Sequence, residues 1–244
     1  MHRWLVSAFL AALVFSSCAP SGGGGGAVSY QRDYWGHRPG PKGFTTVILD
    51  AGHGGHDSGA VSRSTGDMEK TLALDTAQRV RAKLSGRVKV VMMRSGDEFI
   101  DLDERARRAS QRDGAILVSI HYNHSSPGIR GPEMYWWRVD SWGLATRMQR
   151  NLESVVPSEN GNRGQVRRRL RLTRNATVPS VLVECGYLSN PGEARLCSDP
   201  GYRDRLATAI ANAILDQQRN GDPSGTLPRP INAPPSRPTD PPGS

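Results

Sequence analysis

Two histidines and two glutamates of this chain stand where they could hold and use a metal ion. His53 lies in a glycine-rich turn after one predicted strand, and His121 directly follows another. Glu184 closes a third predicted strand, and Glu69 opens a predicted helix. Because ligands bind at the carboxyl ends of the strands in open α/β sheets, we expect all four to converge at one edge. Two histidines, a carboxylate and a water form the ligand set of a catalytic zinc, and a second carboxylate nearby can move protons.

Each of these residues also has an ordinary structural interpretation when it is considered alone. A histidine in a turn is usually a surface residue, a histidine that ends a buried strand is often hydrogen-bonded, and a glutamate in a helix's first turn complements the macrodipole. Glu184 is the exception, because a carboxylate at the end of an apolar strand is costly unless it is paired or used. His56 and His124 are expected to be loop residues, since further protein ligands would exclude water from the metal.

The glycines around His53 do not form a nucleotide-binding loop. Residues 52–57 lack the third glycine of a dinucleotide-binding turn, and no Gly-Lys-Ser/Thr follows, as a phosphate loop would require. The glycines instead allow a sharp turn that directs His53 into a cleft.

Strand and helix patterns alternate along the middle of the chain and predict the scaffold of this site. Strands are expected over 44–50, 87–93, 115–120, 133–139, 169–173 and 180–185, and helices over 69–84, 101–112, 144–155 and 202–218. Asp67 and Ser141 are candidate N-caps, and Gly86 closes the first helix. The alternation predicts an α/β domain around a mostly parallel sheet.

Both ends of the chain have compositions that do not support a folded core. Residues 1–17 combine a basic start with a short apolar run, which is typical of an export signal and is shorter than the ~20 residues of a membrane-spanning helix. The segment Phe-Ser-Ser-Cys ending at Cys18 resembles the lipobox of bacterial lipoproteins, in which the cysteine thiol receives a lipid; an incidental cysteine after a plain signal peptide is the alternative. We expect a flexible linker over 18–42, a folded domain over 43–220 and a proline-rich tail over 221–244.

Four segments of the predicted domain together resemble the signature of zinc-dependent N-acetylmuramoyl-L-alanine amidases. They are ILDAGHGGHDSGA, MEK, VSIHYN and VPSVLVECGYLSNP, in the family's order and spacing, and MRSGDEFIDLDERARRA resembles the family's segment between the second and third. The resemblance covers about residues 44–218. It implies a six-stranded, mostly parallel sheet that is flanked by helices on both faces.

The resemblance also implies a role for each member of the histidine and glutamate set. His53, Glu69 and His121 would bind one zinc ion, and Glu184 would be the catalytic carboxylate. Some relatives insert a long regulatory helix that blocks the zinc until a partner removes it. The segment before Glu184 is short here, so we expect an open site that needs no dedicated activator.

The expected function is hydrolysis of the amide between N-acetylmuramic acid and L-alanine in peptidoglycan, during cell-wall remodelling or daughter-cell separation. The enzyme would act in the periplasm or cell envelope, attached to a membrane through lipidated Cys18. Ser119 and Asn123 are candidate contacts to substrate or to the ligands. Two alternatives stay open: a zinc peptidase that cuts within the stem peptide, and a non-catalytic, lipid-anchored protein that binds peptidoglycan.

The net charge of +9 makes acidic partners worth considering, and six arginines gather in one segment. They are Arg163, Arg167, Arg168, Arg169, Arg171 and Arg174. This segment is either a solvated basic stretch or a groove for the anionic cell-wall polymer. It lacks interleaved aromatic residues and a groove-entering helix, so we do not expect nucleic acid as a partner.

Cys185 follows Glu184 and should point to the opposite, core-facing side of its strand, and a disulfide to Cys197 is not expected.

Overall fold

The computed structural model describes residues 39–157, 161 and 163–223 of the chain. The expected signal peptide, the lipid-attachment residue Cys18, most of the linker and nearly all of the proline-rich tail lie outside these residues. Within the described residues, no helix is both long and apolar enough to cross a membrane.

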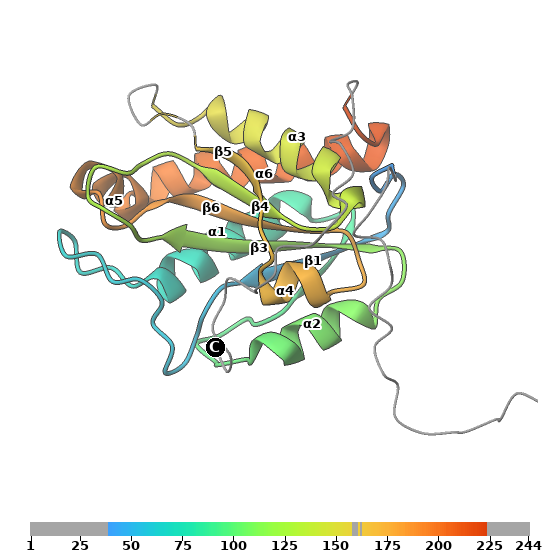
Figure 1. Cartoon of the computed structure of the whole chain (residues 1–244), viewed down its shortest axis with the longest axis horizontal. Coiled ribbons are helices and arrows are strands. Elements are labelled where there is room, and N and C mark those ends of the chain that lie inside the picture. Colours follow the sequence, from blue (N-terminus) through green and yellow to red (C-terminus); the bar gives the residue numbers. More distant parts are fainter. Residues whose placement is uncertain (1–38, 158–160, 162, 224–244) are drawn as a thin grey trace, which may run out of the picture.

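One six-stranded sheet organises the domain, with the strand order β2-β1-β3-β6-β4-β5 (Figure 1). All neighbouring pairs are parallel except β4 and β6, which are antiparallel. The strands are β1 (Thr46–Ala51), β2 (Lys89–Met92), β3 (Ala115–Asn123), β4 (Glu133–Trp136), β5 (Gly164–Arg167) and β6 (Ser180–Tyr187). The predicted fold, a mostly parallel six-stranded sheet, is confirmed.

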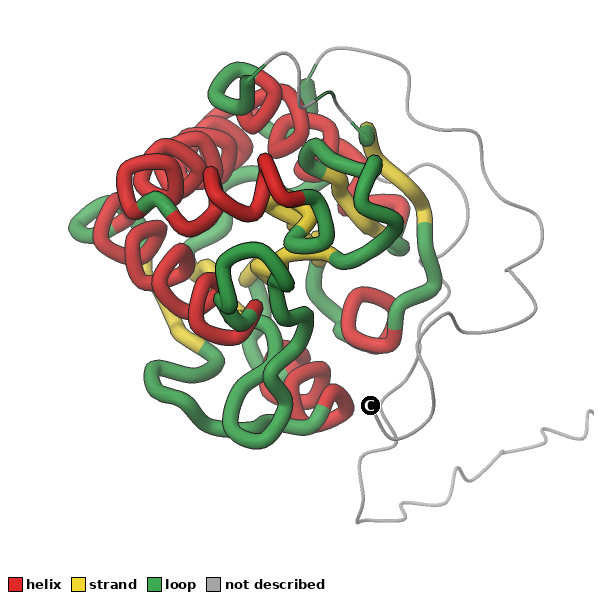
Figure 2. The backbone as a smooth tube through the Cα atoms, turned by 90° about the vertical axis from the view of Figure 1, so that its left-hand side faces the viewer, coloured by secondary structure: helices red, strands yellow, loops and turns green. Residues whose placement is uncertain are grey.

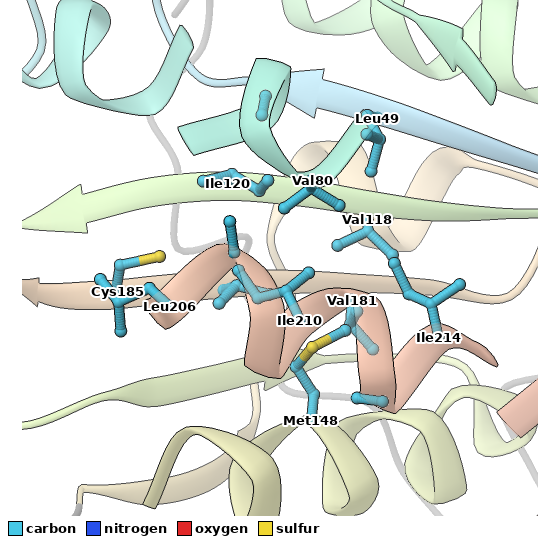
Figure 3. Close-up of a cluster of buried hydrophobic side chains, with 14 of the residues drawn as sticks. Leu49, Val80, Val118, Ile120, Met148, Val181, Cys185, Leu206, Ile210 and Ile214 are labelled. Carbon is cyan, nitrogen blue, oxygen red and sulfur yellow. The ribbon is translucent and has the colours of Figure 1, made fainter. Parts of the chain in front are cut away.

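Helices cover both faces of this sheet. They are α1 (Glu69–Leu84), α2 (Leu102–Ser110), α3 (Trp142–Glu153), α4 (Arg171–Asn175), α5 (Pro191–Ser198) and α6 (Pro200–Asn220), and a short 3₁₀ turn over Val139–Ser141 precedes α3. The larger core cluster joins one sheet face to α1, α3 and α6, and Figure 3 shows Met148 and Ile210 among its members. A smaller cluster lies on the other face, under α2 and α4. The sheet is therefore the middle of three layers.

The strand expected over 169–173 is wrong. The edge strand is β5, which pairs with β4 from Glu133↔Gly164 to Trp136↔Arg167, and the predicted segment leads into the short helix α4. Leu172 of α4 is buried in the smaller core cluster, which a single helical turn achieves as well as a strand would. Helix α5 was not expected, although Asn190 caps it and Pro191 occupies its first turn.

Two of the predicted N-caps have other partners. Met68 occupies the cap position of α1 and makes no side-chain bond there, while the Asp67 carboxylate accepts a hydrogen bond from Ser198 of α5. The Ser141 hydroxyl accepts a hydrogen bond from the Ser180 backbone N–H, which ties the start of α3 to β6. Both side chains thus link distant segments and leave the ends of their own helices uncapped.

The carboxyl ends of β1, β3 and β6 meet at one edge of the sheet, together with the start of α1. Figure 2 looks onto this edge, where loops cover much of the surface. Cys185 points into the larger core cluster, as expected, and both Cys185 and Cys197 are buried free thiols. Side chains on the other face of β6 are those that reach the candidate site.

Candidate metal centre and active site

The turn after β1 places His53 at the carboxyl edge of the sheet. His53 has a φ of +58°, and it is the one non-glycine residue with positive φ in the described part of the chain. A β-carbon at Gly52 would lie 2.2 Å from Cε1 of His121, and one at Gly59 would lie 2.6 Å from Oε2 of Glu69. Glycine is therefore required at both positions, because any side chain would fill the space that the histidine and glutamate occupy.

His53, Glu69 and His121 come together from three separate elements. Each offers one ligand atom, and these three atoms lie within 4.8 Å of one another. Oε1 of Glu69 lies 3.1 Å from Nε2 of His53 and 2.8 Å from Nδ1 of His121. Two imidazole nitrogens and a carboxylate oxygen are the donor types that zinc prefers, so the residues present fit that ion.

The electrostatics of the cluster favour a positive charge at its centre. Burial would raise the pKa of Glu69, but hydrogen bonds and charges from His121 and His53 hold it well below its ordinary value. Burial would lower the pKa of His53, yet Glu69 and Asp57 raise it to about 9. An anionic carboxylate between two histidines therefore provides a site for a cation.

Asp57 supports His53 from outside the cluster. Its Oδ2 lies 2.7 Å from Nδ1 of His53, so the other ring nitrogen, Nε2, faces Glu69. A carboxylate on the second nitrogen of a metal-binding histidine fixes the ring orientation and strengthens the ligand. Asp57 is not among the residues predicted from the sequence, although its position four residues after His53 is a usable signal.

Replacing Asp57 by asparagine is expected to weaken zinc binding by about 10- to 100-fold, since the histidine loses its anionic partner. A chelator competition assay on purified protein measures this. Asp113→Asn, in an exposed turn before β3, is the matched control and should leave zinc affinity unchanged. Equal zinc affinity in the Asp57 variant and in this control would show that Asp57 does not support the ligand.

Glu184 lies beside this cluster on the central strand β6. It is paired in register with His121 of β3 on one side and with Glu133 of β4 on the other. The side chain is buried, and its Oε2 has no hydrogen-bond partner among the described residues. Burial raises the pKa of Glu184 well above its ordinary value, the charges of Glu69 and Glu133 add to this, and Arg168 opposes it. Such a carboxylate can both accept and return a proton.

The remaining predicted residues have separate places. The hydroxyl of Ser119 is fully buried and donates to Asp50, so it can act only through neighbouring residues. The amide Nδ2 of Asn123 reaches the Tyr135 hydroxyl at 3.4 Å, near Glu184. His56 packs against Phe99 at a ring distance of 4.1 Å. His124 lines a different groove of about 330 Å³.

Two buried arginines that the sequence did not predict as site residues hold the turn around His53. Arg105 donates to the Asp50 carboxylate at 2.5 Å and to the His53 carbonyl at 2.6 Å. Arg94 donates to the carbonyls of Ala51, Gly52 and Lys70, which ties the turn to the first residues of α1. Burial alone would raise the pKa of Asp50, but Arg105 and Ser119 hold it below its ordinary value of 3.8.

Removing one member of the Asp50–Arg105 pair should strongly destabilise the fold. Arg105→Met leaves a buried carboxylate unpaired, and we expect a loss of about 3–5 kcal/mol in the free energy of unfolding, measured by urea denaturation. Arg107→Met removes an exposed arginine from the same helix and should change the free energy of unfolding far less. Since ion pairing lowers the pKa of Asp50, the stabilisation is present above pH 4 and is lost as the pH falls through the folded-state value. Equal stability of the two variants would contradict this assignment.

Comparison with known proteins identifies relatives with a similar sequence and the same fold. A family described as Amidase_3, N-acetylmuramoyl-L-alanine amidase, matches residues 47–216. N-acetylmuramoyl-L-alanine amidase LytC of Bacillus subtilis is 32% identical over 181 residues, which cover 71% of this chain and 36% of LytC. The germination-specific N-acetylmuramoyl-L-alanine amidase of the same organism is 30% identical over 201 residues, which cover 72% of this chain and 81% of that protein. The chain thus spans about a third of LytC but most of the second relative.

Solved structures agree with these sequence matches. The N-acetylmuramoyl-L-alanine amidase from Clostridium difficile 630 superimposes with a TM-score of 0.67 at 32% identity, covering 72% of this chain and 97% of that one. The catalytic domain of the amidase CwlV from Bacillus (Paenibacillus) polymyxa gives the same TM-score at 35% identity, over 70% of this chain and 97% of that one. The chain therefore belongs to the N-acetylmuramoyl-L-alanine amidase family.

Proposed function

We propose that this protein is a zinc-dependent amidase that separates the stem peptide of peptidoglycan from its glycan strand. The observation that carries the proposal is the meeting of His53, Glu69 and His121 within 4.8 Å, with Glu184 in register beside His121. One zinc ion per chain would be held by the first three residues. A zinc ion in such a site activates water and polarises the substrate carbonyl.

The chain's own residues then account for the proton transfers of amide hydrolysis. Glu184 accepts the proton of the attacking water as a new bond forms to the carbonyl carbon of the muramic acid lactyl group. Glu184 returns that proton to the L-alanine nitrogen as the carbon–nitrogen bond breaks, because an amine leaves readily only when protonated. The free Oε2 of Glu184 is the atom available for both steps.

The proposed place of action is the cell envelope, with peptidoglycan as the partner. Residues 1–17 would direct export to the periplasm, and Cys18 would attach the protein to a membrane through a lipid. A relative in Staphylococcus epidermidis, 30% identical over 69% of this chain and 57% of its own, carries the name probable cell wall amidase LytH. Cell-wall remodelling or daughter-cell separation is the corresponding proposed role.

The site is proposed to be open without an activator protein. The described helices between Trp137 and Glu184 are α3 and α4, and they pack into the two helix layers, against α6 and α2 respectively. Purified protein loaded with zinc should therefore hydrolyse sacculi on its own.

Mass spectrometry of digested sacculi tests the proposal against its two alternatives. An amidase releases intact stem peptides with a free L-alanine amino terminus and leaves unsubstituted muramic acid. A peptidase within the stem would instead shorten the peptides, and a wall-binding protein without turnover would release nothing. Intact peptides that disappear when zinc is removed by a chelator, and return when it is restored, are the expected result.

A further inference from the structure

Arg168 lies against Tyr135, in a different place from Arg167 and Arg171 of the same segment. Its guanidinium lies over the Tyr135 ring at 5.2 Å, and its Nη1 donates to the Tyr135 hydroxyl at 3.3 Å. Arg167, by contrast, lies over the rings of Trp136 and Trp137, and Arg171 pairs with Asp103. Since Tyr135 and Trp136 alternate along β4, Arg167 and Arg168 approach that strand from opposite sides.

The charge of Arg168 acts on the catalytic carboxylate. Burial and the Glu133 carboxylate raise the pKa of Tyr135 to about 12, and burial also raises that of Glu184 well above its ordinary value. The positive charge of Arg168 opposes both shifts. Glu133, the cross-strand neighbour of Glu184, has hydroxyl partners of its own, because its Oε2 accepts hydrogen bonds from Tyr135 and Tyr187. The charge of Arg168 therefore acts on Glu184, and Arg168 forms no ion pair with Glu133 or Glu184 among the described residues.

A second hydrogen-bond donor, the side-chain amide of Asn123, reaches the same Tyr135 hydroxyl as Arg168. Nδ2 of Asn123 also approaches the Tyr135 hydroxyl, at 3.4 Å, from the end of β3. Oδ1 of Asn123 accepts a hydrogen bond from the His124 backbone N–H at 2.8 Å, which fixes the orientation of the amide. Asn123 and Arg168 are both only half-buried, so solvent and ligands can reach them.

Arg168 carries more hydrogen-bond donors than the described protein groups around it accept. A guanidinium carries five N–H groups, and the Arg168 side chain makes one long hydrogen bond and no ion pair among the described residues. A half-buried arginine with unused donors beside a fixed amide is a binding site for a planar anion, most favourably a carboxylate.

The substrate has its carboxylates on one side of the scissile bond only. In a muramoyl amide the lactyl carboxyl group is consumed by the amide itself, and the sugar carries no other. The carboxylates belong to the stem peptide, and the first of them is on its second residue. A carboxylate-binding arginine therefore marks the side of the cleft that holds the leaving peptide.

We propose that Arg168, together with the amide of Asn123, binds the free carboxylate of the second stem-peptide residue and so places the leaving nitrogen beside Glu184. This inference rests on the proposed amidase function. Arg168 is then a specificity-determining residue, which favours stems with a free carboxylate over stems in which that group is a carboxamide.

Two muramoyl peptides test this, identical except for a free carboxylate or a carboxamide at the second stem residue, with the carboxyl terminus amidated in both. We expect the full-length, zinc-loaded enzyme to favour the acid by roughly 10- to 100-fold in kcat/KM, chiefly through KM, which is the range of a charge-assisted hydrogen bond. Arg168→Gln should abolish this preference by lowering kcat/KM for the carboxylate substrate alone, and Arg168→Lys should retain part of the preference. Arg167→Gln, the neighbouring arginine on the other side of β4, should keep the wild-type ratio of kcat/KM values.

The outcomes separate this inference from the proposed function. Equal kcat/KM values for acid and amide in the wild-type enzyme, or an equal decrease for both in Arg168→Gln, would overturn the inference and leave the amidase function standing. Failure of zinc-loaded wild-type enzyme to cut either substrate would contradict the function. In that case, the free stem peptides are made separately, one with the carboxylate and one with the carboxamide, and their binding is measured by NMR on folded wild-type and Arg168→Gln protein. Tighter binding of the acid peptide to wild-type protein, and no such preference in Arg168→Gln, would support the inference; equal binding of both peptides to wild-type protein would overturn it.

Discussion

Glu184→Gln should lower the rate of muramoyl amide hydrolysis by about 10²- to 10⁴-fold while leaving zinc content unchanged. Glutamine keeps the shape of the side chain but cannot accept the proton of the attacking water. The loss should fall on kcat, because the exchange removes an interaction that is made only while bonds form and break. Hydrolysis of a soluble muramoyl peptide, with zinc measured in the same sample, gives both quantities.

The matched control for this variant is Glu104→Gln. Glu104 is on the surface of α2, where it pairs with Arg107 and Arg108, so its replacement should change neither rate nor zinc content. A Glu184→Gln protein that is folded, loaded with zinc and as active as this control would remove Glu184 from the mechanism.

Glu69→Gln is expected to act on metal binding itself. Oε1 of Glu69 lies between Nε2 of His53 and Nδ1 of His121, and its Oε2 accepts a hydrogen bond from the Ala60 backbone N–H. Losing the anionic ligand should weaken zinc binding by more than the roughly 10- to 100-fold typical of a supporting residue such as Asp57. Activity should therefore be absent at stoichiometric zinc and recover in part when zinc is added in excess.

Zinc rescue distinguishes the two glutamates. Excess zinc should restore some activity to Glu69→Gln and none to Glu184→Gln, because only the first variant lacks a ligand. Titration with zinc, followed by the rate of hydrolysis, makes this comparison. Rescue of both variants or of neither would mean that the two residues do not have the separate roles assigned here.

The sequence predicts the layers of the fold and the residues of the site better than it predicts the edge of the sheet. Buried central strands such as 115–120 carry continuous apolar runs, and long amphipathic helices repeat their pattern over several turns. The edge strand β5 has neither signal, because Gly164–Arg167 is partly exposed and rich in polar residues. The arginine-rich segment that follows buries little besides Leu172 and Thr173, so strand and helix patterns could not be told apart there.

The structure brings the three predicted ligands together because each one lies at, or within two residues of, an end of a strongly patterned element. The residues that support them carried weaker signals. Asp57, Arg94 and Arg105 act through contacts between distant segments, and such contacts follow from packing in three dimensions that spacing along the chain does not specify. The role of Arg168 likewise depends on which side of β4 it approaches, and the misplacement of the edge strand concealed this.

A zinc-edge anomalous diffraction measurement on crystals of the zinc-loaded protein tests the central claim most directly. We predict one strong anomalous peak per chain, with His53 Nε2, His121 Nδ1 and a Glu69 carboxylate oxygen at about 2.0–2.2 Å, and with Glu184 close by but not coordinated. A peak elsewhere on the chain, a peak coordinated by Glu184 in place of one of the three ligands, or a zinc-loaded protein without a peak at this position would contradict the account.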